Sequence, residues 1–435
     1  MMRQSGDDKF SRRGFLAFLA SSPLFAAYGV HISSLRRLIH GSDGDQRTAL
    51  KLVQQATQEP ELISSPSEAL NVFDFEPVAR KKLPPAHWGY LATGTDDDGT
   101  IRANREGFNR YELRMRRLID VSKVDTSIQL LGARWETPIV MSPIGSHKAF
   151  HTEGELAVAR AAKARGHLWV LSTVATTSVE DASAARGQPV WFQLYARTDW
   201  NQTRAMVKRV EAAGCPAIVL TVDLLGGSNR ETLLRAQRQD TRQCSTCHAG
   251  GRPMPGISGR VDDRDNRRKP MLAEPAPGTP IPEAGTLTWD FVKRLKDTTN
   301  MKVLIKGIVT RDDAELAMMH GVNGLFVSNH GGRAENSGRA TISSLPEVVA
   351  GVANRAPIIV DGGFRRGTDI FKGLALGATA VGVGRPYIWG LASFGQEGVE
   401  TVLALLRRET EIVMRQAGTT SVKRITRDYV VARGA

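Results

Sequence analysis

The chain has 435 residues, of which 41% are hydrophobic and 24% are charged, and this composition excludes a disordered or fibrous protein. No run of about 18 apolar residues lacks charge, which excludes a polytopic membrane protein, and three cysteines are too few for a disulfide framework. The net charge of +13 comes from basic residues spread along the chain. Because no basic helix is interleaved with aromatic residues, we expect a basic solvated surface and no nucleic-acid partner.

The first 40 residues have the pattern of an export signal. Arg12 and Arg13 precede an apolar stretch over residues 15–30, as in twin-arginine signals. We expect residues 1–40 to be a twin-arginine export signal, or an anchor at the inner membrane if they are retained, and residues 41–70 to be a polar linker. This predicts a periplasmic protein. The alternative is a chance pair of arginines before a short buried helix.

Eight short apolar runs alternate with helical stretches from residue 137 onward. Runs this apolar suit parallel strands that are buried on both faces. The sequence therefore predicts an α/β fold, a (β/α)8 TIM barrel over residues 71–430 with an N-terminal cap at 71–136. An open doubly wound sheet is the alternative. The expected strands are 138–141, 168–171, 190–192, 217–220, 303–305, 325–327, 357–360 and 380–383.

The connection after the fourth expected strand is abnormally long. Residues of about 239–285 are rich in Arg, Asp, Gly and Pro and have little periodicity, so we expect a long mobile insertion. It contains Cys244, Cys247 and His248, a Cys-x-x-Cys-His string typical of c-type haem attachment. Met254 is a candidate axial ligand. A disulfide, an adventitious metal site and coincidence are the alternatives, and Cys215 is expected in the core.

Glycine-rich turns with arginines end the seventh and eighth expected strands, at 361–367 and 382–385. In a (β/α)8 barrel the chemistry collects at these carboxyl ends. Glycines let backbone N–H groups approach an anion closely, and the arginines add positive charge. The two turns together predict a phosphate-bearing ligand.

The sixth expected strand ends in a histidine suited to proton transfer. His330 precedes two glycines, and an imidazole exchanges protons near neutral pH. Asp223, at the end of the fourth strand, is placed to stabilise the protonated ring. Lys306 and Tyr195, at other strand ends, supply an amine suited to a reduced cofactor and a hydroxyl donor for the substrate. Arg230 and Arg333 suit a carboxylate, and Tyr90 in the expected cap is a second hydroxyl donor.

These strings resemble the FMN-dependent 2-hydroxy-acid dehydrogenase and oxidase family, which includes glycolate oxidase, mandelate dehydrogenase and the bacterial respiratory L-lactate dehydrogenases. The resemblance covers about residues 71–430, except the insertion after the fourth expected strand, and the motifs follow in the family's order. It rests on residues 89–94, 104–105, 192–195, 220–223, 305–307, 328–333, 361–369 and 384–386.

The resemblance implies that FMN oxidises an L-2-hydroxy acid to the 2-oxo acid, with His330 as base and Asp223 as its partner. It places the substrate carboxylate near Arg230, Arg333 and Tyr90, and the substrate hydroxyl near Tyr195. The FMN contacts that it implies are Ile144, Gly145, Ser172, Gln193, Thr221, Lys306, Ser328, Asp361, Gly362, Gly363, Arg365, Gly384 and Arg385.

Two positions depart from the oxidases of this family. Val174 stands where a bulky aromatic residue often lines the substrate pocket, and the string 171–174 resembles the respiratory L-lactate dehydrogenases. We therefore expect L-lactate, with a larger or aryl 2-hydroxy acid as the alternative. Gly145 stands where the oxidases commonly carry alanine, which favours a dehydrogenase that passes electrons to a quinone or a cytochrome c over an oxidase that uses O2.

Two further functional hypotheses remain open. One is an FMN-dependent isomerase, against which the Arg230 and Arg333 pair argues. The other is a non-catalytic redox relay, in which the flavin passes electrons to a haem in the insertion. By analogy with the family, we also expect a homotetramer.

Overall fold

The computed structural model describes residues 62–434, except 198, 225–226, 243–268 and 273–286. The chain divides into two compact units, residues 1–62 and 63–435. The expected export signal, most of the expected linker and the expected haem-attachment string lie outside the described residues. Within the described part, no helix is long and apolar enough to cross a membrane.

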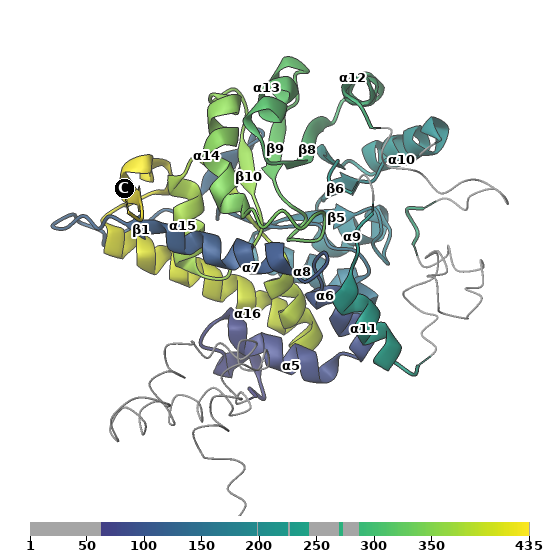
Figure 1. Ribbon diagram of the computed structural model, residues 1–435, viewed down its shortest axis with the longest axis horizontal. Coiled ribbons are helices and arrows are strands. Elements are labelled where there is room, and N and C mark those ends of the chain that lie inside the picture. Colours follow the sequence, from purple (N-terminus) through teal and green to yellow (C-terminus); the bar gives the residue numbers. More distant parts are fainter. Residues whose placement is uncertain (1–61, 198, 225–226, 243–268, 273–286, 435) are drawn as a thin grey trace, which may run out of the picture. The chain divides into compact units, whose positions relative to one another are not determined.

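Eight parallel strands close into a barrel at the centre of the second unit (Figure 1). Each strand pairs with the next one along the chain, and the last pairs with the first, so no edge remains. The predicted (β/α)8 barrel is thus confirmed, and the alternative of an open sheet is wrong. The strands are β4 (Ile139–Met141), β5 (Leu168–Ser172), β6 (Trp191–Leu194), β7 (Ala217–Thr221), β8 (Lys302–Ile308), β9 (Gly324–Val327), β10 (Ile358–Val360) and β11 (Ala380–Val383).

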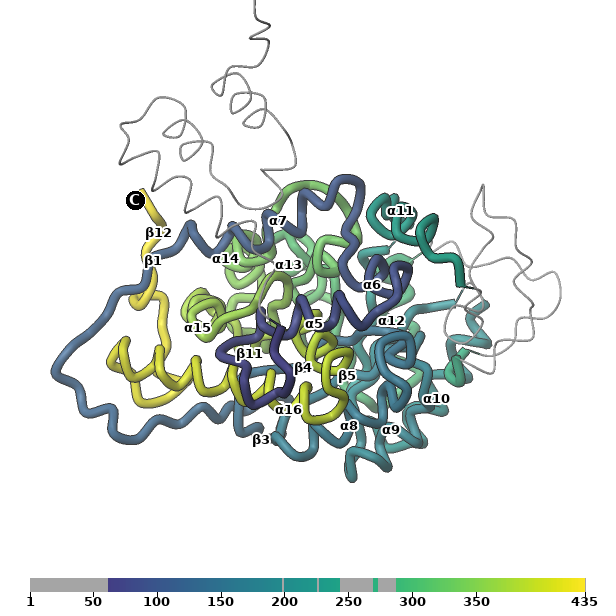
Figure 2. The backbone as a smooth tube through the Cα atoms, turned by 90° about the horizontal axis from the view of Figure 1, so that it is seen from below, coloured from purple at the N-terminus to yellow at the C-terminus, as the bar shows by residue number. Residues whose placement is uncertain are grey.

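Helices follow the strands and form the outer ring of the barrel (Figures 1 and 2). Local capping defines several of them: Ser178 and Thr310 accept hydrogen bonds from backbone N–H groups in the first turns of α9 and α13. The helices are α8 (Gly154–Arg165), α9 (Val179–Arg186), α10 (Trp200–Ala212), α11 (Glu231–Gln239), α12 (Trp289–Thr298), α13 (Arg311–Met319), α14 (Thr341–Val352), α15 (Gly367–Ala375) and α16 (Arg385–Ala417), the last broken by non-helical backbone at Phe394 and Gly395.

Three N-terminal helices cover part of the barrel: α5 (Phe75–Lys82), α6 (Pro85–Ala92) and α7 (Gly99–Glu106). Helix α5 packs on α16, and α6 packs on α11 (Figure 2). The second contact is close, since a Cβ atom on Gly89 would lie 2.4 Å from the Cβ of Ala236. The neighbouring residue in α6, Tyr90, is thereby held beside the start of α11, where Arg230 lies.

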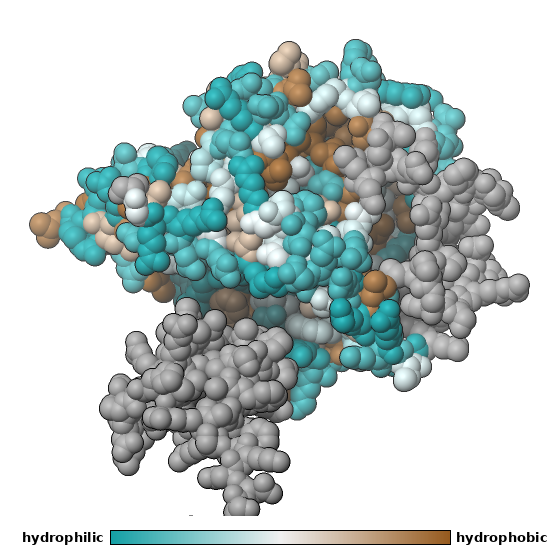
Figure 3. Space-filling view, in the orientation of Figure 1, coloured by the Kyte–Doolittle hydropathy of each residue, from teal (hydrophilic) through white to brown (hydrophobic). Residues whose placement is uncertain are grey.

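Two short antiparallel ribbons complete the fold. They pair β2 (Ile128–Leu130) with β3 (Ala133–Trp135), and β1 (Tyr111–Leu113) with β12 (Val430–Ala432). The core consists mainly of strand side chains and the inner faces of the helices, and Cys215 is buried in it as expected. Hydrophilic side chains dominate the face of the molecule shown in Figure 3.

Candidate active site

One cavity lies at the carboxyl ends of the barrel strands and encloses about 880 Å³, its open mouth included. Four expected residues do not line it but lie directly behind its wall: Gln193, Thr221, Asp223 and Ser328. The expected residues that do line it are Tyr90, Ile144, Gly145, Ser172, Val174, Tyr195, Arg230, Lys306, His330, Arg333, Asp361, Gly362, Gly363, Arg365, Gly384 and Arg385.

His330 lies between a carboxylate and a phenol. Its Nδ1 is 2.7 Å from Oδ1 of Asp223, and its Nε2 is 3.2 Å from the hydroxyl of Tyr195. The residue has a φ of +57°, which is rare for a side chain with a Cβ atom. Asp223 in turn packs on Gly307, where a Cβ atom would lie 2.7 Å from the Asp223 Cβ. The geometry orients the ring and leaves Nε2 on the side of the cavity.

The electrostatics of this pair favour a neutral imidazole and a charged carboxylate. Burial lowers the pKa of His330, and Asp223 only partly offsets that effect. Burial alone would raise the pKa of Asp223, but His330 and Lys306 together hold it below its ordinary value. Burial also raises the pKa of Tyr195, so this phenol remains protonated. His330 is therefore a base that is ready to accept a proton.

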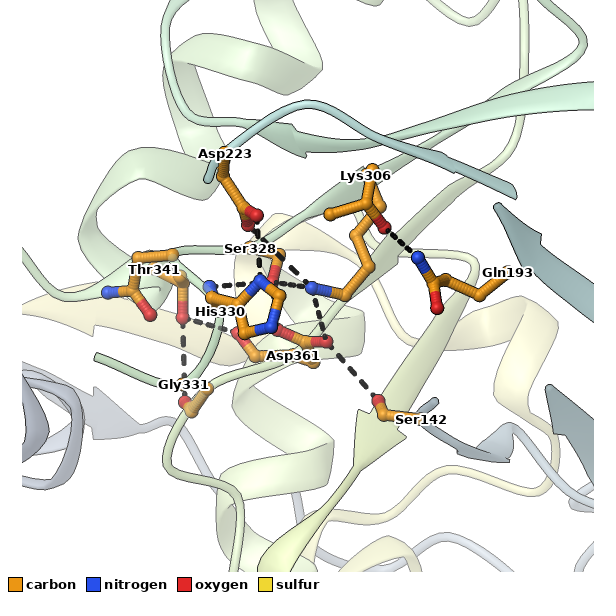
Figure 4. A network of polar contacts seen from close by, with 12 residues as sticks. Ser142, Gln193, Asp223, Lys306, Ser328, His330, Gly331, Thr341 and Asp361 are labelled. Carbon is orange, nitrogen blue, oxygen red and sulfur yellow. Dashed lines mark hydrogen bonds and ion pairs between the residues drawn. The ribbon is translucent and has the colours of Figure 1, made fainter. Parts of the chain in front are cut away.

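Lys306 joins this pair to the seventh strand of the barrel (Figure 4). Its Nζ donates to Oγ of Ser328 at 2.8 Å, and Ser328 donates to Oδ1 of Asp361 at 2.6 Å. The amine also lies 3.8 Å from Asp223 and 3.9 Å from Asp361, so it serves two buried carboxylates. Ser142, which sequence reasoning did not single out, donates to the other oxygen of Asp361.

A second chain of hydrogen bonds crosses three adjacent strands. Ser172 at the end of β5 donates to Oε1 of Gln193 at 3.0 Å, and Nε2 of Gln193 donates to Thr221 at 2.9 Å. All three side chains are buried. The backbone N–H of Thr173 also donates to Oε1 of Gln193, which fixes the end of the amide that carries oxygen. Together these bonds form a polar wall suited to the heteroatoms of a flavin.

The cavity carries more positive than negative charge, which is what a phosphate-bearing cofactor needs. Arg365 and Arg385 are hydrogen-bonded to backbone carbonyl groups, and neither forms an ion pair within the described residues. Burial lowers the pKa of each to about 10, which leaves both charged at neutral pH. Gly362 and Gly363 have φ values of +106° and +85°, and a Cβ at Gly363 would lie 2.3 Å from the carbonyl oxygen of Asn104. The residues present therefore fit FMN.

The two arginines expected to bind a carboxylate, Arg230 and Arg333, both line this cavity. Arg333 donates to the carbonyl oxygens of Tyr90 and Thr93, and its guanidinium lies 4.7 Å from the centre of the Tyr90 ring. Burial, followed by the charge of Arg230, lowers the pKa of Arg333 to about 9. Two partly buried cations that line one cavity favour an anionic ligand there.

Sequence reasoning missed the amide pair that supports the histidine loop. Asn104 in α7 and Asn329 exchange two hydrogen bonds of 2.9 Å each. Asn329 also accepts the N–H of Gly332, and Asn104 accepts the N–H of Thr341. Both residues lie in strings that carry the family resemblance, but the resemblance assigned neither of them a role. Nothing in the sequence pairs Asn329 with a residue 225 positions away.

The structure does not test the expected haem site. Its residues, Cys244, Cys247, His248 and Met254, lie outside the described residues. Among the residues that are described, no group of histidine, cysteine and acidic side chains is arranged to hold a metal ion.

Comparisons with known proteins agree with this site. The FMN-dependent dehydrogenase family model matches residues 79–432. Glycolate oxidase 1 from Oryza sativa subsp. indica is 40% identical over 363 residues, which cover 83% of this chain and 96% of the relative. Glycolate oxidase 3 from Arabidopsis thaliana is 39% identical over 363 residues, with the same coverage.

Solved structures give the same result. A soluble mutant of the membrane-associated (S)-mandelate dehydrogenase from Pseudomonas putida is 31% identical, with a TM-score of 0.73, and covers 83% of this chain and 99% of its own. Mandelate oxidase with (S)-2-phenylpropionate is 34% identical, with a TM-score of 0.69, and covers 82% of this chain and 96% of its own. The chain therefore belongs to the FMN-dependent dehydrogenase family, whose members are oxidoreductases that oxidise 2-hydroxy acids.

Proposed function

We propose that this protein is an FMN-dependent L-2-hydroxy-acid dehydrogenase that oxidises L-lactate to the 2-oxo acid and passes the electrons to a quinone or a cytochrome c. The observation that carries the proposal is the meeting of two sets of side chains in one cavity. The His330 and Asp223 pair supplies a base, and Arg230 with Arg333 supplies a carboxylate site.

The residues suggest a division of labour during the reaction. Arg230 and Arg333 bind the substrate carboxylate and fix its orientation, while Tyr195 donates a hydrogen bond toward the substrate hydroxyl. Nε2 of His330 accepts a proton from the substrate, and Asp223 stabilises the imidazolium that forms. Bound FMN supplies the two-electron acceptor. Lys306 adds positive charge beside it, where a reduced flavin carries negative charge.

The substrate proposal rests on the wall of the cavity near Val174. The string 171–174 resembles the respiratory L-lactate dehydrogenases, which supports lactate, and the apolar Val174 is compatible with its methyl group. Val174 also leaves room, which keeps a larger aryl 2-hydroxy acid as the second candidate, in line with the mandelate relatives.

The acceptor proposal rests on Gly145. A Cβ atom at this position would lie 2.4 Å from Cγ2 of Val174, so alanine does not fit unless Val174 moves. Glycine at this place favours a dehydrogenase over an oxidase that uses O2. A related protein described as a membrane-associated dehydrogenase supports the same choice.

Three further proposals concern parts that the structure does not describe or a state that it does not contain. The Arg12 and Arg13 motif supports twin-arginine export to the periplasm, with membrane association if the signal is retained. The string at Cys244, Cys247 and His248 supports a covalent haem c as internal acceptor. A homotetramer is proposed by analogy with the family. Export of a folded protein suits one that binds FMN in the cytoplasm.

The first test is an anaerobic absorption spectrum of the natively exported protein before and after L-lactate. Bleaching of the flavin band supports the proposed reaction, and a sharpened haem band shows that the insertion carries the acceptor. An oxidised flavin in the presence of L-lactate directs the test to aryl 2-hydroxy acids. If no 2-hydroxy acid reduces the flavin, the non-catalytic relay is favoured. The variant His330→Ala should retain FMN and lose flavin reduction.

A further inference from the structure

A short piece of the long insertion lies against the active-site loops. Residues 269–272 are described, and four hydrogen bonds join them to the barrel. Arg209 in α10 donates to the carbonyl oxygen of Pro270 at 2.7 Å. The N–H of Val179 at the start of α9 donates to the sulfur of Met271 at 3.4 Å, and Met271 is 3% exposed.

The first residue of this piece is a buried lysine. Lys269 is only 7% exposed, and its Nζ donates to the carbonyl oxygen of Val174 at 2.7 Å and to the hydroxyl of Ser146. A buried ammonium is costly unless it is hydrogen-bonded, so these contacts hold it in place. Both acceptors belong to loops that shape the cavity: Ser146 follows Gly145, and Val174 is itself part of the wall.

The two loops meet at Val174. The N–H of Ser146 donates to the Val174 carbonyl at 3.0 Å, so this oxygen accepts from the backbone and from Lys269 together. Ser146 has a φ of +62°, a conformation that needs support from its surroundings. Gly145 lies so near Val174 that a Cβ atom would overlap it. A small movement of the Val174 carbonyl therefore changes the width of the cavity at this wall.

The barrel supplies its own link between these loops, one layer farther from the cavity. The carboxylate of Glu155 in α8 accepts the N–H of His147 at 3.0 Å and the N–H of Thr176 at 2.7 Å. This link fixes residues 147 and 176, on the far side of Ser146 and Val174. Lys269 instead donates hydrogen bonds directly to Ser146 and Val174.

We propose that Lys269 is a positioning residue through which the insertion sets the width of the substrate pocket at Val174. The inference rests on the proposed function, because it concerns which 2-hydroxy acid that site accepts. With the ammonium in place, Val174 is held inward and short side chains are favoured. Without it, the wall can relax outward and admit an aryl group.

The test compares Lys269→Met with Met271→Leu, a change in the same buried piece that removes no ammonium. Flavin reduction is measured under anaerobic conditions with L-lactate and with (S)-mandelate. We expect Lys269→Met to lower the ratio of kcat/KM for L-lactate over (S)-mandelate by about tenfold, the effect of roughly one methylene of pocket space. Met271→Leu should leave this ratio unchanged. A merely structural role for Lys269 would lower the melting temperature and leave the ratio as it is.

Ser146→Ala removes one acceptor of the same ammonium and should shift the ratio in the same direction, so it decides the question if Lys269→Met does not fold. An unchanged ratio in folded, FMN-containing Lys269→Met overturns the inference while the proposed function stands. If wild-type flavin is reduced by neither acid, the proposed function fails instead. The ratio of Kd for propionate over Kd for phenylacetate, followed by the flavin spectrum, then tests the wall: a rise in this ratio when Lys269 is replaced supports the inference, and no change overturns it.

Discussion

Replacing Asp223 with asparagine tests the proton-transfer pair most directly. The change keeps the size of the side chain and removes the charge that faces His330 Nδ1 at 2.7 Å. With the charge centres about 4 Å apart and an effective dielectric constant of about 20, the carboxylate stabilises a protonated ring by about 4 kcal/mol. If the transition state carries most of that charge, flavin reduction slows by about a thousandfold.

The assay is stopped-flow reduction of bound flavin by L-lactate, expressed per flavin so that cofactor loss does not count as lost catalysis. Asp297→Asn, which replaces an exposed carboxylate in α12, is the matched control and should keep the wild-type rate. A rate for Asp223→Asn within tenfold of wild type would refute the view that this carboxylate stabilises the imidazolium.

The remaining predictions concern pH, substrate and cofactor. Because burial lowers the pKa of His330 and only the neutral ring accepts a proton, a plot of kcat/KM against pH should fall on the acid side only below about pH 6.5. Asp223 raises this pKa, so Asp223→Asn should move the acid-side fall to still lower pH. Arg333→Lys should raise KM for L-lactate by about tenfold or more, because an ammonium cannot bind a carboxylate in bidentate fashion; an unchanged KM places the carboxylate elsewhere. Arg365→Gln should weaken FMN retention during gel filtration without changing the melting temperature of the apoprotein by more than a few degrees, and full retention would show that the phosphate lies elsewhere. Gly145→Ala should lower the melting temperature or the affinity for substrate, as its methyl group meets Val174 at 2.4 Å; a variant with neither change would show that Val174 moves freely.

The architecture was predictable because it depends on patterns that are local in sequence. All eight apolar runs became strands of the barrel, since a strand buried on both faces needs continuous apolar residues. The positions of His330, Lys306 and Asp361 at strand ends then placed them at one face of the barrel, because parallel strands share their carboxyl edge.

Two contacts that support the site could not be predicted from the sequence. The exchange of hydrogen bonds between Asn104 and Asn329 joins a cap helix to a barrel loop, and no spacing in the sequence indicates such a pair. The contact of Lys269 with Val174 is of the same kind, since it comes from an insertion that has no periodicity and whose expected role was haem attachment.

The sequence by itself therefore determined the barrel and predicted anionic ligands and a histidine base, because each follows from residue type and strand order. Only the tertiary structure decided which ring nitrogen of His330 faces Asp223, which cations lack a carboxylate partner among the described residues, and which segment supports the Val174 wall. Those features depend on distances between residues far apart in the chain, and such distances are set by packing.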